Sequence, residues 1–92
     1  VIIAYEPIWA IGKTSGEAIG TTDLAEMTLY IRKVLAEIYP GKRAMSTTVI
    51  YGGSVEPENI RGLAGGSGVD GFLVGHASVE PTMFAALVKA VS

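Results

Sequence analysis

The sequence predicts an α/β fold in which strands and helices alternate around a parallel sheet. Three short apolar runs, each ended by glycine or proline, have the composition of buried strands. A segment with helical periodicity follows each of them, and such alternation implies right-handed crossover connections. Three units of this kind do not by themselves distinguish a closed barrel from a doubly wound sheet.

The first unit begins with residues 1–5, a continuous apolar run typical of a strand buried on both faces. A long loop is expected over residues 7–20. Thr21, Thr22 and Asp23 offer N-cap chemistry, and Asp23 and Glu26 have the spacing of a capping box. The helix that follows should place its apolar residues on one face: Leu24, Met27, Ile31, Val34, Leu35 and Ile38.

The remaining two units repeat this order. Pro40 and Gly41 end the first helix, and residues 47–51 form the second strand. Residues 57–63 fit a short helix with a proline in its first turn, and residues 71–74 form the third strand. Pro81 then opens a last helix, whose predicted apolar face consists of Phe84, Leu87, Val88 and Val91.

Composition limits the functions that the chain can have. Of 92 residues, 49% are hydrophobic and 17% are charged, as in a folded domain with a substantial core. A net charge of −2 gives no electrostatic case for nucleic acid or an anionic membrane. The absence of cysteine excludes disulfides and thiolate metal sites, and no apolar stretch approaches the roughly 18 residues of a membrane span.

Residues 1–92 are expected to belong to one domain, because no linker, repeat or low-complexity segment divides them. No signal-peptide pattern is present at the start. The chain begins at Val1, already within a strand-like run, and we therefore expect it to be cut from a longer protein.

Two segments resemble nucleotide-binding motifs, but their positions in the sequence do not fit those motifs. Gly12-Lys13-Thr14 lacks the upstream glycine of a Walker A loop, since Pro7 occupies that position. Residues 66–71 spell G-x-G-x-x-G but precede a strand, whereas a dinucleotide fingerprint joins a strand to a helix. We interpret them as a turn. His76 is the only histidine, so neither a metal site nor a catalytic triad is supported.

Unusual residues follow all three predicted strands. The first strand ends at Glu6-Pro7, the second at Gly52-Gly53-Ser54 and the third at Gly75-His76. In parallel α/β folds, functional groups gather at the carboxyl ends of strands. Glycines there allow backbone N–H groups to approach an anion closely. A glutamate beside such a site could transfer protons while the backbone N–H groups bind the anion.

Three segments resemble the triosephosphate isomerase family: Ala-Tyr-Glu-Pro-Ile-Trp-Ala-Ile-Gly at 4–12, Tyr-Gly-Gly-Ser at 51–54, and Gly-Phe-Leu-Val-Gly-His-Ala-Ser at 71–78. The first is highly specific, while glycine-rich turns like the other two recur in many barrels. The resemblance covers the entire chain and implies the last three βα units of a TIM (β/α)8 barrel, so that residues 1–92 are the carboxyl-terminal segment of one barrel domain.

The resemblance implies an isomerase that interconverts dihydroxyacetone phosphate and glyceraldehyde 3-phosphate, in glycolysis and gluconeogenesis, without cofactor or metal. It also implies a cytoplasmic homodimer with most of its interface outside this segment. Glu6 would be the general base, which moves a proton between adjacent carbons through an enediolate. Other roles follow in the same way: phosphate binding by Gly12, Ser54, Gly75 and His76, and lid or clamp functions for Pro7, Trp9, Ile11, Tyr51 and Leu73.

Three departures from the family pattern qualify these expectations. Residues 13–20 differ from the usual end of the lid, and His76 replaces a glycine in the phosphate turn, where a positive φ would be costly. The family's first-strand lysine and asparagine, its electrophilic histidine and its dimer loops are absent from these residues. We therefore expect residues 1–92 alone to be inactive and poorly soluble, with two open sheet edges.

Two alternatives to an enzyme segment remain. The chain could be a noncatalytic module that binds phosphosugars, with Glu6 inert, or a structural half-barrel that assembles with another chain. Mere phosphate binding requires neither Glu6 nor Trp9 and Ile11, so their presence together favours the enzyme.

Overall fold

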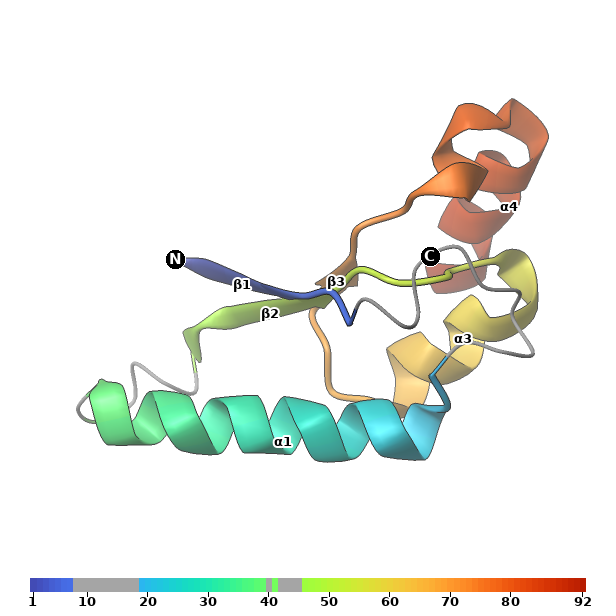
Figure 1. The fold of residues 1–92 in the computed structure, drawn as a ribbon. Helices are drawn as coiled ribbons and strands as arrows, with labels where there is room; N and C mark the ends of the chain where they lie inside the picture. Colours follow the sequence, from blue (N-terminus) through green and yellow to red (C-terminus); the bar gives the residue numbers. More distant parts are fainter. Residues whose placement is uncertain (8–18, 40, 42–45) are drawn as a thin grey trace.

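The computed structural model describes residues 1–7, 19–39, 41 and 46–92 (Figure 1). Its strands form one parallel sheet in the order β1-β2-β3, as the alternating pattern predicts. The elements are β1 (Ile2–Tyr5), α1 (Thr21–Ile38), β2 (Thr48–Tyr51), α3 (Pro57–Gly66), β3 (Gly71–Phe72), the 3₁₀ helix η2 (His76–Val79) and α4 (Pro81–Val91).

The strand register brings the carboxyl ends of the three strands to one edge of the sheet. Tyr51 in β2 pairs with Tyr5 in β1 on one side and with Phe72 in β3 on the other. The hydrogen bonding continues one residue further, because Gly52 N donates to Tyr5 O at 2.9 Å and Leu73 N to Tyr51 O at 2.9 Å. The segments after the strands therefore leave the sheet side by side.

Helix α1 begins earlier than its cap signals suggest. Its N-cap is Gly20, which has no side chain to make a capping bond, and Thr21 to Asp23 form the first turn. The predicted capping box of Asp23 and Glu26 is therefore wrong. Threonine and aspartate are suitable both at the N-cap and in the first turn of a helix, and here Asp23 lies in the first turn, where its negative charge interacts favourably with the helix dipole. A capping box occurs instead at α3, between Glu56 and Asn59.

The core lies between β2, α1, α3 and α4. Tyr51 and Leu24 are completely inaccessible to solvent, and Leu63 and Leu87 are nearly so. In Figure 1, α1 runs along one side of the sheet, while α3 and α4 lie side by side beyond the carboxyl ends of the strands. The buried cluster takes residues from the three helices, from β2 and from the segments beside them: Ile19, Leu24, Tyr51, Val55, Ile60, Leu63, Ala77 and Leu87.

Several predicted core positions are exposed instead. The first strand is not buried on both faces, since Ile2 is 65% exposed, and Ile38, the last residue of α1, is 64% exposed. On α4 only Leu87 is buried among the four predicted residues, because the helix packs on α3 and η2 along a narrow stripe. In the part of the chain that the structure describes, β1 and β3 are the edge strands and no other strand pairs with their outer sides, as expected for three strands.

Within the part of the chain that the structure describes, no helix is long and apolar enough to cross a membrane.

Candidate functional site

Glu6 directly follows β1, and its side chain lies over the backbone that follows β2. A Cβ atom built on Gly52 would lie 2.8 Å from Glu6 Cγ and 3.0 Å from Glu6 Oε1. The glutamate itself is exposed, whereas Gly52 is buried. The structure thus brings together the ends of the first two strands, as the sequence predicts, and turns the carboxylate toward the glycine-rich segment.

Tyr51 ends β2 with its whole side chain buried beneath that segment. A side chain at Gly53 would overlap the Tyr51 hydroxyl, so this glycine makes room for the phenol. Burial raises the pKa of Tyr51, the backbone N–H of Ile19 partly offsets this, and the nearby Tyr5 phenol adds to it. The hydroxyl therefore remains protonated at neutral pH and available as a hydrogen-bond donor.

Among the described residues, the Tyr51 hydroxyl forms no hydrogen bond of ordinary geometry, and the Ile19 N–H lies near without completing one. Buried polar atoms are nearly always paired, so an unpaired hydroxyl at this edge of the sheet marks a place where a further partner would be favourable.

The start of α3 holds the segment that contains Ser54. Asn59 Nδ2 donates to Ser54 O at 3.0 Å, and Asn59 Oδ1 accepts from Glu56 N at 2.8 Å. Ser54 is itself buried. Sequence reasoning missed Asn59, although the spacing of Glu56 and Asn59 around Pro57, at the start of a helix, could have indicated a capping box.

The third strand is shorter than predicted, and its end carries Leu73, Gly75 and His76. Leu73 is 43% exposed, and His76 is the exposed first residue of η2. Ser78 closes this turn, because its N and Oγ both donate to Gly75 O, at 2.9 and 2.6 Å. No described residue other than glycine has a positive φ, so His76 fits the turn without the cost that a positive φ would carry there.

Four of the predicted site residues lie close to the sheet edge in sequence and structure: Glu6, Tyr51, Ser54 and Leu73. Pro7 is also described, and is buried. Trp9, Ile11 and Gly12 lie outside the described residues.

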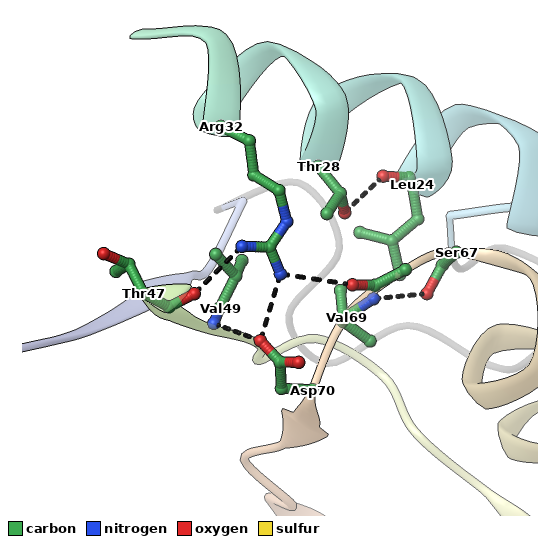
Figure 2. A network of polar contacts seen from close by, with 9 residues as sticks. Leu24, Thr28, Arg32, Thr47, Val49, Ser67, Val69 and Asp70 are labelled. Atoms are coloured by element: carbon green, nitrogen blue, oxygen red, sulfur yellow. Dashed lines mark hydrogen bonds and ion pairs between the residues drawn. The ribbon is translucent and has the colours of Figure 1, made fainter. Parts of the chain in front are cut away.

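A polar network that the sequence analysis missed lies at the opposite, amino-terminal end of the sheet (Figure 2). Arg32 of α1 donates to Thr47 O at 2.9 Å and to Asp70 Oδ2 at 3.1 Å, while Val49 N donates to the same carboxylate oxygen at 2.8 Å. Asp70 N in turn donates to Val49 O at 2.7 Å. These contacts fasten α1 and the turn before β3 to the start of β2.

The hydrogen bond from Val49 N, more than the neighbouring Arg32 guanidinium, holds the pKa of Asp70 below its usual value of 3.8, against a smaller effect of desolvation. The turn predicted for residues 66–71 is confirmed for residues 67–70, which join α3 to β3. Its polar residues take part in the network: Ser67 Oγ accepts from Val69 N, and Gly68 O lies 3.5 Å from Arg32 Nη2.

In the ranges 1–7, 19–39, 41 and 46–92, no group of three or more His, Cys, Asp or Glu side chains is placed to hold a metal ion.

The parallel sheet and the helices that follow its strands define an α/β protein with a candidate site at the carboxyl ends of the strands. Comparison with known proteins specifies which one. Residues 1–91 match the sequence model of the family Triosephosphate isomerase, and the chain belongs to the triosephosphate isomerase family. The fold is thus part of a TIM barrel, as the resemblance implied.

Two relatives show the extent of the match. The chain is 44% identical over 88 residues to the triosephosphate isomerase of Chlamydia felis (strain Fe/C-56), covering 96% of this chain and 34% of that protein. It is 46% identical over 88 residues to the triosephosphate isomerase of Chlamydia abortus (strain DSM 27085 / S26/3), with the same coverage. The chain spans about a third of the length of these curated relatives.

Proposed function

We propose that the chain supplies the last three βα units of a triosephosphate isomerase, which interconverts dihydroxyacetone phosphate and glyceraldehyde 3-phosphate. The observation that carries this proposal is the placement of Glu6, whose carboxylate lies over the Gly52 backbone at the edge where the strands end. Family membership over residues 1–91 supports the reaction. The whole enzyme would be a cytoplasmic homodimer that uses neither cofactor nor metal.

In this proposal Glu6 is the general base. It removes a proton from one carbon of the triose and returns it to the neighbouring carbon, so that an enediolate forms between the two steps. Its exposure and its freedom from ion pairs in the described residues leave the side chain able to reach a substrate. Ile11 and Leu73 would enclose the carboxylate when the lid of residues 7–12 closes, and exclusion of water would make it more basic.

The substrate phosphate would be bound by backbone N–H groups of Gly12, Ser54, Gly75 and His76. The capping bonds of Asn59 support this role, because they hold the Ser54 backbone in one conformation. An imidazolium at His76 would add charge favourable to a phosphate.

Tyr51 and Ser54 would hold the closed lid, whose first residues include Pro7 and Trp9. The buried, unpaired hydroxyl of Tyr51 supports this part of the proposal, since a lid N–H or C=O group could complete its hydrogen bonding.

The test is an isomerase assay on the full-length protein expressed from the reading frame that encodes this chain. We expect turnover in both directions, and a loss on the order of 10² to 10⁴ in kcat for Glu6→Gln. Glu26→Gln, on the exposed surface of α1, is the matched control and should keep the parent rate. Phosphosugar binding without turnover would contradict the proposal and favour the noncatalytic module.

Residues 1–92 alone should be inactive and poorly soluble. The exposed side chains of Val1, Ile2 and Val79 leave apolar surface in water, and within the described residues no further strand pairs with either edge of the sheet. Isomerase turnover by the isolated chain, abolished by Glu6→Asp, would overturn this expectation.

A further inference from the structure

Gly52 occupies a fixed point directly beneath the Glu6 side chain. Its N–H donates to Tyr5 O at 2.9 Å, so its backbone is tied to the end of β1, the strand that carries the glutamate. A Cβ atom there would lie 2.8, 3.0 and 3.2 Å from Glu6 Cγ, Oε1 and Cδ respectively. The carboxyl arm of Glu6 therefore fills the space that any side chain at position 52 would take.

We propose that Gly52 is a positioning residue for Glu6, and that its lack of a side chain, rather than its N–H group, is its contribution to the site. The N–H is already used in the bond to Tyr5 O and is unavailable to a substrate anion. This inference rests on the proposed function, in which Glu6 is the base.

The consequence of adding a side chain depends on which neighbour can move. Glu6 is an exposed side chain with rotatable bonds, whereas the Gly52 backbone is buried and hydrogen-bonded. An alanine at position 52 therefore displaces the carboxylate and leaves the fold intact. Displacement of a catalytic group by about 1 Å can lower the rate on the order of 100-fold.

Gly53 provides the contrast within the same segment. A side chain there would overlap Tyr51, which has no exposed surface. An alanine at position 53 should therefore disturb the packing of the fold, whereas one at position 52 acts on the reacting group. The two adjacent glycines serve different purposes.

The experiment compares Gly52→Ala with Gly65→Ala in the full-length protein. Gly65 is exposed in α3, and a Cβ atom there would have no neighbour within 4 Å, so its variant controls for the glycine replacement itself. We expect Gly52→Ala to lower kcat on the order of 100-fold with an unchanged KM and an unchanged melting temperature. Gly65→Ala should keep the parent kcat.

A double-mutant cycle separates positioning from a structural role. If Gly52 acts through Glu6, adding Gly52→Ala to Glu6→Gln should produce no further loss of kcat. A parent-like kcat in Gly52→Ala, an equal loss in the Glu6→Gln background, or a loss that accompanies a lowered melting temperature would each overturn the inference.

A readout independent of activity distinguishes failure of this inference from failure of the proposed function. In the parent, nuclear Overhauser cross-peaks should connect Glu6 Hγ with Gly52 Hα, and Gly52→Ala should weaken them. An inactive parent with these cross-peaks would refute the isomerase proposal but keep the placement of Glu6. Absence of the cross-peaks overturns the inference whether or not the parent is active.

Discussion

The two ends of the sheet differ in whether their polar side chains are paired within the fold. At the amino-terminal end, Arg32 and Asp70 bind each other and the backbone of β2, so their polar groups are satisfied within the fold. At the carboxyl-terminal end, Glu6 and His76 are exposed, and the Tyr51 hydroxyl has no partner among the described residues. In α/β barrels the first end generally serves stability and the second chemistry.

This difference predicts that substitutions at the two ends separate in what they change. Variants at the amino-terminal end should alter the free energy of unfolding and leave kcat alone. Variants of the exposed groups at the carboxyl-terminal end should lower kcat and leave the free energy of unfolding unchanged. The following experiments on the full-length protein test that separation. One of them concerns a residue at the carboxyl-terminal end whose substitution should lower stability.

The largest expected effect is that of Glu6→Gln on catalysis. Loss of the base should lower kcat by a factor on the order of 10² to 10⁴, because an amide cannot accept the substrate proton. The melting temperature should stay at the parent value, since Glu6 is exposed and forms no ion pair in the described part of the chain. Steady-state kinetics and calorimetry on the same samples give the two readouts. A destabilised variant would show that Glu6 also supports the fold.

Gly53→Ala should break the separation, because this residue lies at the functional end but packs against the buried Tyr51. Overpacking of this kind costs about 1–3 kcal/mol of unfolding free energy. Urea titration measures it, with Gly65→Ala as control in open space. Parent-like stability would mean that the Tyr51 ring moves easily.

Arg32→Met should lower the free energy of unfolding by about 1–2 kcal/mol, since it removes hydrogen bonds from a charged donor that is largely buried. The exposure of Asp70, at 47% of its side chain, keeps the effect at this moderate level. Arg61→Met on the exposed surface of α3 is the control. A change in kcat without a change in the urea midpoint would contradict the assignment of this end to stability.

The smallest expected effect concerns pH. Because the pKa of Asp70 lies below its usual 3.8 in the folded state, its carboxylate stabilises the fold fully above that value. This contribution is lost as the pH falls through the lower, folded-state pKa. Asp70→Asn lacks the titration, so the stability difference between parent and variant should shrink in acid. Unfolding free energies measured across that range would refute the idea if the difference stayed constant.

The sequence alone predicted the elements and a candidate site at the carboxyl ends of the strands, and the location of that site stays a prediction. Apolar runs and helical spacing are local patterns, and they located β1, β2, β3, α1, α3 and α4 among the described residues, although the third strand is shorter than expected. Glu6 was predicted to belong to the candidate site because it follows an apolar strand, and parallel strands end at a common edge. The positions of Trp9, Ile11 and Gly12 stay predictions.

The tertiary structure decided which residues far apart in the chain are in contact. Arg32 and Asp70 are separated by 38 positions, and no periodicity in either segment indicates that they meet. The exposure of Ile2 and Val88 likewise depends on which elements cover them, and not on their own apolar character. The same holds for Gly52, whose sequence context suggested an anion-binding N–H. Only the register of β1 against β2 places it under Glu6, because register, unlike strand propensity, is set by packing across the whole sheet.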